Sequence, residues 1–139
     1  MSDPEGLLDT SAVLALPRLH DPSLLPEVAL ISAITLAELA VGPLVATDET
    51  ERARRLAQVQ QAEADFDPIP FDARAARAFA LVAASYRSAG RKPAARAFDA
   101  MIAATAIANG LPLYTANPAD FVGIDELVVR AVPPPEPRG

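Results

Sequence analysis

The chain has 139 residues, of which 51% are hydrophobic and 5% aromatic, and this length predicts one domain with a mainly aliphatic core. The absence of Cys excludes disulfides and thiolate metal sites, and a single histidine, His20, argues against multi-histidine zinc sites and Ser–His or Cys–His chemistry. The net charge of −6 lacks the basic character of an avid nucleic-acid binder.

The first half of the chain predicts two short strands, each followed by a helix, and then a third, more exposed helix. In chain order these are a strand at 7–8, a helix at 12–16, a strand at 28–32, a helix at 35–41 and a helix at 48–63. The second strand, VALIS, is β-branched and apolar, which is typical of a strand covered on both faces. Gly42-Pro43 is expected to end the second helix.

The second half predicts three strands and two helices. In chain order these are a strand at 66–71, a helix that Asp72 caps and Gly90 ends, a helix at 94–109 closed by Gly110, a strand at 111–115, a helical turn at Asn117-Pro118 and a strand at 127–132. We expect residues 1–132 to form one domain and the proline-rich segment 133–139 to be a flexible tail.

Neither end nor interior of the chain suggests export or a membrane. MSDPEG has no basic and apolar leader, and the longest apolar runs are too short to span a bilayer. We therefore expect a cytoplasmic protein without a membrane partner.

Strands that alternate with helices predict an α/β fold with a mostly parallel central sheet and helices on both faces. In such sheets ligands bind beyond the carboxyl ends of the strands. Asp9 ends the first strand, Glu38 lies one turn into the helix after the second strand, and Asn117 follows a later strand. This edge of the sheet is therefore the place to look for a functional site.

Each of these polar residues also has a structural explanation. Glu38 lies three residues after Thr35 and matches a capping box. Asp9 is a good turn or capping residue at a strand end, and Asn117 before Pro118 is a good helix N-cap. Asp120 is a carboxylate that a helix dipole would stabilise in a first turn.

Asp99 has the weakest structural explanation. It is the only charged residue between 97 and 109, in a helix of Ala, Ile and Met, and we place it in the body of that helix. An ion pair with Arg96 is the simple alternative. A carboxylate among apolar residues otherwise requires a cation, because burying it unpaired is costly.

Asp9, Glu38 and Asp99 come from three segments that a parallel sheet would bring to one edge. Oxygen ligands without His or Cys favour a hard ion, Mg²⁺ or Mn²⁺. Three neighbouring carboxylates repel one another, so at least one should hold its proton unusually strongly without metal. A carboxylate-held Mg²⁺ suits phosphodiester hydrolysis, since it activates water and stabilises developing negative charge.

The segments LLDTSAVLAL, AITLAELAVGP and FDAMIAATAIANGLPLYTANPADF, in this order, resemble the PIN-domain ribonucleases, and more narrowly the VapC-type toxins of bacterial toxin–antitoxin pairs. The resemblance implies a compact α/β fold, an acidic site with Mg²⁺ or Mn²⁺, and endonucleolytic cutting of RNA, often tRNA or other structured RNA. It also implies a cognate antitoxin that binds an apolar groove, and a homodimer. The residues carried over are the carboxylates Asp9, Glu38 and Asp99 and the nearby hydroxyls Thr10, Ser11 and Thr115.

One position departs from the family pattern. Many relatives carry a fourth acidic residue where this chain has Asn117. Asn117 could bind a metal-bound water, or Asp120 could supply the charge. A single ion held by three carboxylates is therefore favoured over a two-metal site.

Six of the twelve Lys and Arg residues lie between Arg74 and Arg96. A solvated helix face accounts for most of them. We expect Arg91, Lys92 and Arg96 to supply phosphate contacts, because RNA must approach an acidic site.

Two other functions fit part of the pattern. A phospho-acceptor receiver domain also holds Mg²⁺ at strand ends, but it needs adjacent acids at the first strand and a lysine after a late strand. Here Thr10 follows Asp9, and Lys92, the only lysine, precedes a helix. A catalytically inactive PIN-like interaction module is the other alternative, which Asn117 keeps open.

Overall fold

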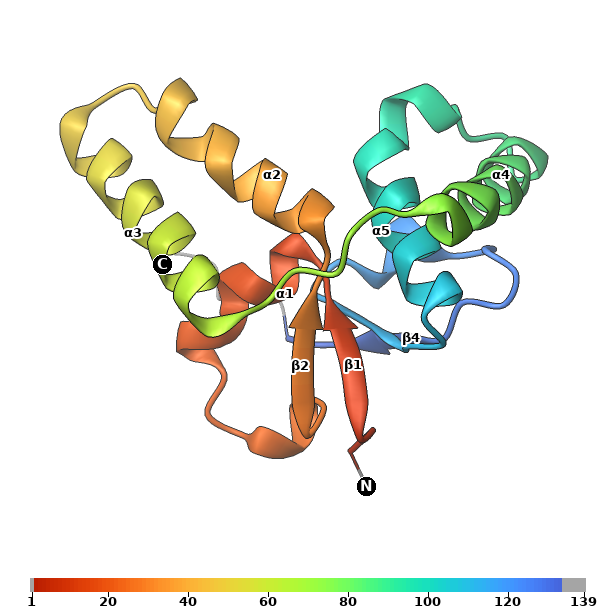
Figure 1. Ribbon diagram of the computed structural model, residues 1–139, viewed down its shortest axis with the longest axis horizontal. Helices are drawn as coiled ribbons and strands as arrows, with labels where there is room; N and C mark the ends of the chain where they lie inside the picture. Colours follow the sequence, from red (N-terminus) through yellow and green to blue (C-terminus); the bar gives the residue numbers. More distant parts are fainter. Residues whose placement is uncertain (1, 134–139) are drawn as a thin grey trace.

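Four parallel strands form the centre of the computed structural model, which describes residues 2–133 (Figure 1). Their spatial order is β2–β1–β3–β4, and every neighbouring pair is parallel. The strands are β1 (Glu5–Leu8), β2 (Val28–Ile31), β3 (Leu113–Thr115) and β4 (Val129–Ala131). The predicted parallel α/β fold is therefore confirmed.

Five helices surround the sheet, and short 3₁₀ turns join several of them. The α-helices are α1 (Thr10–Ala15), α2 (Ala33–Val41), α3 (Glu49–Asp65), α4 (Ala73–Ser88) and α5 (Ala97–Ala108). The 3₁₀ turns are η1 (Leu16–Arg18), η2 (Pro22–Leu24), η3 (Gly42–Val45), η4 (Pro93–Arg96) and η5 (Pro118–Phe121). In Figure 1, α2 and α3 form an antiparallel pair on one side of the sheet, and α4 and α5 lie on the other.

Successive residues of β1 point to opposite faces of the sheet, as the pleat requires. Leu7 packs with side chains of α4 and α5, whereas Leu8 packs with side chains of α1, α2 and α3. Leu113 and Tyr114 of β3 divide between the same two cores. Helices thus cover both faces of the central strands. The polar side chains of this region lie at the carboxyl ends of the strands.

The segment 66–71, predicted to be a strand, forms only one parallel bridge, between Ile69 and Ser32. Pro68 and Pro70 on either side of Ile69 have no N–H group, so the pairing cannot extend along the chain. The prediction of a strand was wrong, although the segment does run beside the edge strand β2.

The second strand also differs from expectation. We predicted a strand covered on both faces, but β2 is an edge strand and Val28 at its start is 51% exposed. Only Ile31 at its end is fully buried. The apolar sequence of β2 reflects the burial of its last residue, but it does not indicate that the strand lies at the edge of the sheet.

Helix α2 begins at Ala33, two residues earlier than predicted, and a different residue caps it. The Ser32 hydroxyl accepts the Thr35 N–H at 3.1 Å, so Ser32 is the N-cap. Thr35 is fully buried inside the first turn. The predicted capping box between Thr35 and Glu38 was therefore wrong, and Glu38 is free to serve another purpose.

The other helix ends agree better with their local signals. Asp72 caps α4 through its hydrogen bond from the Ala75 N–H at 3.0 Å. Gly90 and Gly110 follow α4 and α5 with φ of +78° and +64°, as predicted for helix-ending glycines. No helix among residues 2–133 is long and apolar enough to cross a membrane. The predicted flexible tail 133–139 lies outside the described residues except for its first residue.

Candidate functional site

Asp9 is fixed at the carboxyl end of β1, where α1 begins. Its Oδ1 accepts the Ala12 N–H at 2.9 Å and the Ser11 hydroxyl at 2.7 Å, so the carboxylate caps α1. The residue is only 5% exposed. The predicted capping role is confirmed, and it leaves the carboxylate held rigidly at the edge of the sheet.

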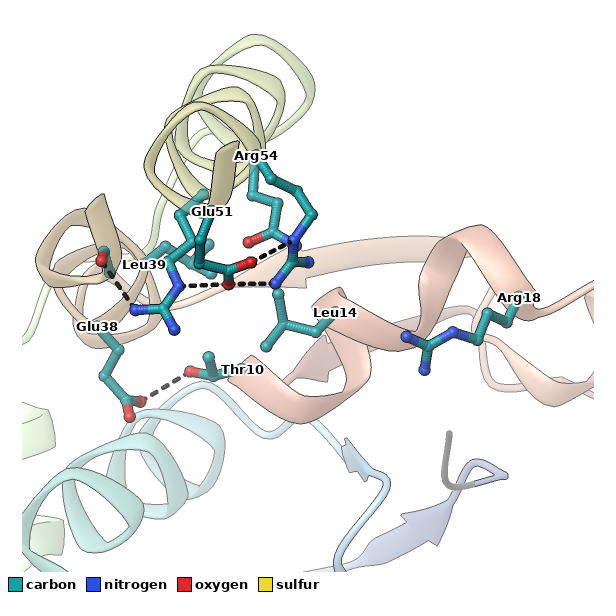
Figure 2. Close-up of a pocket in the computed structure, with 10 residues that line it drawn as sticks. Thr10, Leu14, Arg18, Glu38, Leu39, Glu51 and Arg54 are labelled. Atoms are coloured by element: carbon teal, nitrogen blue, oxygen red, sulfur yellow. Dashed lines mark hydrogen bonds and ion pairs between the residues drawn. The ribbon is translucent and has the colours of Figure 1, made fainter. Parts of the chain in front are cut away.

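Glu38 projects from α2 toward the start of α1 (Figure 2). The Thr10 hydroxyl donates to Glu38 Oε1 at 2.7 Å and lies 3.3 Å from the hydroxyl oxygen of Thr35. Because Thr10 and Glu38 are 28 residues apart, only the tertiary fold joins them. Glu38 is oriented by a neighbouring segment and not by its own helix.

Asp99 lies in the first turn of α5, because residues 93–96 form the separate 3₁₀ turn η4. The prediction that it lies in the body of a helix starting at 94 was therefore wrong. Arg96 is its nearest cation, with Nη1 3.9 Å from Asp99 Oδ2. The same nitrogen donates to Asp120 Oδ1 at the shorter distance of 2.9 Å. Arg96 therefore lies between two carboxylates, and its closer contact is with Asp120.

The acidic side chains raise one another's pKa values. Burial, together with the negative charges of Asp120, Glu38 and Asp9, raises the pKa of Asp99 to about 6. Burial also raises the pKa values of Asp9 and Glu38. The negative charge of Asp120 adds to the rise for Asp9, and the negative charge of Asp9 adds to the rise for Glu38. The hydroxyls that donate to Asp9 and Glu38 oppose these shifts. The four carboxylates therefore share one electrostatic environment.

The carboxylates of the site lie near one another, but, as the structure describes them, they are not arranged as a metal coordination shell. Within the part of the chain that the structure describes, no three Asp, Glu, His or Cys side chains are arranged such that they could hold a metal ion. Each carboxylate instead uses a hydrogen-bond donor or cation of the chain, namely Ser11, Thr10 or Arg96. Repulsion between carboxylates favours this separation when no cation lies between them.

The chemistry of the donors nevertheless fits a hard divalent ion. The site offers carboxylate and hydroxyl oxygens, the ligands that Mg²⁺ and Mn²⁺ prefer. Burial and neighbouring negative charge both raise the pKa values of Asp9, Glu38 and Asp99, and a cation would offset both effects. The residues that the sequence singled out thus lie close enough at one edge of the sheet to affect one another's pKa values.

The remaining polar residues of the site tie β3 to α1. The Ser11 and Thr115 hydroxyl oxygens are 3.3 Å apart, and the Ala116 N–H donates to Ser11 at 2.9 Å. The Asn117 N–H donates to the Thr115 hydroxyl at 2.9 Å. Asn117 occupies the predicted N-cap position of η5 before Pro118, although its side chain makes no capping hydrogen bond.

The three basic residues expected to contact RNA lie in different surroundings. Arg91 donates to the carbonyls of Asp120 and Ala119, both at 2.9 Å, and its guanidinium lies 5.7 Å from the centre of the Tyr86 ring. It therefore fastens η5 to the end of α4. Arg96 is paired as described above, whereas Lys92 is exposed.

A second group of cations lies on the other side of Glu38, in a hollow between α1, α2 and α3 (Figure 2). Arg54 and Arg55 both bind Glu51, and Arg55 also donates to the Gly42 carbonyl at 3.0 Å. Arg18 lines the same hollow. No local sequence pattern places these arginines near Glu38, because Arg18 lies in η1 and Arg54 and Arg55 lie in α3, whereas Glu38 lies in α2.

A parallel α/β domain with acidic side chains gathered at the carboxyl edge of its sheet is typical of metal-assisted phosphodiester chemistry. The family model described as "PIN domain" matches residues 7–127. Since this match covers most of the chain, the protein belongs to the PIN domain family. The receiver-like alternative is left without support.

The most similar relatives share both sequence and fold with this chain. "Ribonuclease VapC5" of Mycobacterium tuberculosis is 38% identical over 122 residues, which cover 86% of this chain and 87% of that protein. "Ribonuclease VapC" of Rickettsia bellii is 31% identical over 130 residues, 91% of this chain and 96% of that protein. The crystal structure of VapBC-5, a toxin–antitoxin system of M. tuberculosis, matches with a TM-score of 0.80 and 34% identity, over 93% of this chain and 99% of that chain.

Two features of the site were not found from the sequence. The Tyr86 hydroxyl donates to the Asp120 carbonyl at 3.0 Å, so Tyr86 and Arg91 together fix the turn that carries Asp120. Thr35 lies beside the Thr10 hydroxyl beneath Glu38. Nothing in the local sequence around either residue indicates its distant partner.

Proposed function

We propose that this chain is an endoribonuclease that depends on Mg²⁺ or Mn²⁺ and acts as the toxin of a type II toxin–antitoxin pair. The observation that carries this proposal is the group of carboxylates at the strand ends, where burial and the neighbouring negative charges together raise the pKa of Asp99 to about 6. The names of the relatives, ribonuclease VapC and a VapBC toxin–antitoxin system, support the same activity and an antitoxin partner.

Asp9, Glu38 and Asp99 would hold the ion. When bound, a divalent ion lowers the pKa of water and stabilises the negative charge that develops on a phosphodiester during hydrolysis. The chain's own contribution is orientation. Ser11 and the start of α1 fix Asp9, and the Thr10 hydroxyl fixes Glu38, so fewer side-chain rotations must be frozen when the site assembles.

Asn117 and Arg96 favour a single ion. Asn117 carries no charge, and the carboxylate of Asp120 is already paired with Arg96. A two-ion site would require more negative charge than the three remaining carboxylates supply.

Arg96, which pairs with Asp99, and the exposed Lys92 would contact the phosphates of an approaching RNA, while Arg91 supports the turn that carries Asp120. The protein would act in the cytoplasm on tRNA or other structured RNA. A homodimer is expected by analogy with the family.

The test is RNA cleavage by purified, antitoxin-free protein with Mg²⁺ or Mn²⁺, on total RNA, tRNA and an unstructured oligoribonucleotide. Wild type should cut RNA, and both a chelator and Asp99→Asn should abolish cutting. Asp125→Asn, which removes an exposed carboxylate in the loop after η5, is the matched control and should cut normally.

Cutting that persists in chelator would refute the metal dependence. An absence of both cutting and Mn²⁺ binding would assign the protein to the inactive interaction-module alternative. Mn²⁺ binding without cutting on these RNAs would refute the general ribonuclease and leave a narrow substrate to be identified.

A further inference from the structure

Phe98 is the most exposed aromatic side chain of the described residues. It is 53% exposed, whereas Tyr86, Tyr114 and Phe121 are at most 4% exposed. Phe71 and Phe79 pack edge to face in the core with ring centres 6.4 Å apart. Single exposed apolar side chains are common on protein surfaces, so exposure alone does not give Phe98 a role, and any role depends on what lies beside the ring.

The position of Phe98 on α5 adds to this. The helix beyond it is the most buried of the fold, with Ala100, Ile102 and Ala103 at most 1% exposed. Phe98 precedes Asp99, so the two side chains leave the helix about 100° apart. One side chain reaches the acidic site and the other lies beside it on the surface.

The ring lines a hollow that is also lined by two carboxylates of the acidic site, Glu38 and Asp99. This hollow of about 380 Å³ is bounded by Phe98, Asp99, Glu38 and Arg96, and its remaining lining is alanine. Small side chains leave room for a flat group against the ring, and the volume lies within the range of small-ligand pockets. A phosphate that a divalent ion would hold near Asp99 and Glu38 therefore brings the neighbouring atoms of its ligand to Phe98.

We infer that Phe98 is a stacking platform for an unpaired nucleobase next to the phosphate that is cut. This inference rests on the proposed ribonuclease function and adds to it a side chain that binds a base beside the acidic residues. Aromatic side chains bind single-stranded RNA by stacking on bases, and bases inside a duplex have no free face. Arg96 at the rim of the hollow complements the adjoining phosphate.

The test compares four proteins on one unstructured oligoribonucleotide and on the same strand annealed to its complement. Phe98→Ala and Phe98→Leu should raise KM for the single strand about five- to hundredfold, the range that loss of one stacked base predicts, with kcat nearly unchanged. Phe98→Trp should keep the wild-type KM. Wild type should cut the annealed duplex poorly.

Leu81→Ala is the matched control, because Leu81 is 62% exposed and lines a different hollow. A second readout uses the non-cleaving Asp9→Asn background and an oligoribonucleotide with 2-aminopurine at successive positions. Stacking should quench its fluorescence at one position, and Phe98→Leu should remove that quenching while the fold, followed by circular dichroism, is unchanged.

The outcomes separate this inference from the proposed function. Wild type that cuts no RNA would overturn both. Wild type that cuts RNA while Phe98→Ala keeps both KM and quenching would overturn the stacking platform alone. If Phe98→Leu behaves like wild type, or if Phe98→Ala weakens only the binding of the cognate antitoxin, the ring serves apolar contact with a protein and the inference is wrong.

Discussion

Replacing Asp99 by Asn should stabilise the metal-free protein near neutral pH, although it removes the central acidic residue. The fold raises the pKa of Asp99 from 3.8 to about 6 through burial and the charges of Asp120, Glu38 and Asp9. Between these two values the folded protein holds a proton that the unfolded chain has released. The stability therefore falls as the pH rises from about 4 to 6, and the loss persists above that.

The size of the effect follows from the pKa difference. One pKa unit corresponds to about 1.4 kcal/mol, which sets an upper limit of about 3 kcal/mol. The Asp99 side chain is 32% exposed, and solvent screening together with the lost Arg96 contact reduces this figure. We expect Asp99→Asn to gain about 1–2 kcal/mol at pH 7.5, or roughly 3–8 °C in Tm.

The assay is thermal and urea unfolding between pH 4 and pH 8 in chelator, with Asp125→Asn as the control. The gain should be present at pH 7.5 and shrink toward pH 4, where Asp99 is protonated in the folded state and about half protonated in the unfolded state. Mg²⁺ at a hundredfold excess over its Kd should stabilise wild type by about 2.7 kcal/mol and the variant much less. An Asn variant that is less stable at pH 7.5, or a gain that does not change with pH, would refute this account of the site.

Two further predictions concern the groups that orient the carboxylates. Thr10→Val keeps the side-chain shape but removes the hydroxyl that donates to Glu38 at 2.7 Å. Mn²⁺ affinity measured by calorimetry should fall about tenfold, as is typical when a supporting hydrogen bond to a metal ligand is lost, and an unchanged Kd would show that Glu38 is not oriented by Thr10. Arg96→Gln removes the cation that lowers the pKa of Asp99 and frees the charge of Asp120. The pKa of Asp99, followed by carboxyl ¹³C NMR in chelator, should rise above about 6, and a fall would contradict the assignment of these charges.

Local residue patterns predicted most element boundaries because the interactions that set them are local. The Asp72 side chain caps α4 by accepting the N–H of Ala75, three residues along the chain. Gly110 adopts the positive φ that closes α5. The alternation of apolar strands with helices predicted a parallel sheet, and that topology in turn predicted that Asp9, Glu38 and Asp99 share one edge. Their raised pKa values are consistent with this.

Errors arose where local patterns allowed two structures. Ser32 and Thr35 are both good caps, and only the bridge of Ser32 to Ile69 at the edge of the sheet fixes where α2 begins. The apolar segment 66–71 has strand composition, but its prolines stop the ladder after one bridge. The start of α5 was placed too early, because a 3₁₀ turn and an α-helical turn have similar sequence preferences.

By itself, then, the sequence determined the fold class, the candidate carboxylates and the kind of ion they suit, since periodicity, strand order and ligand chemistry follow from residue type and spacing. Only the tertiary structure decided the partners of those carboxylates. Thr10 reaches Glu38 across 28 residues, and Arg96 reaches Asp120 across 24. Such contacts depend on how helices pack on the sheet, and this packing reflects the whole core and no single segment.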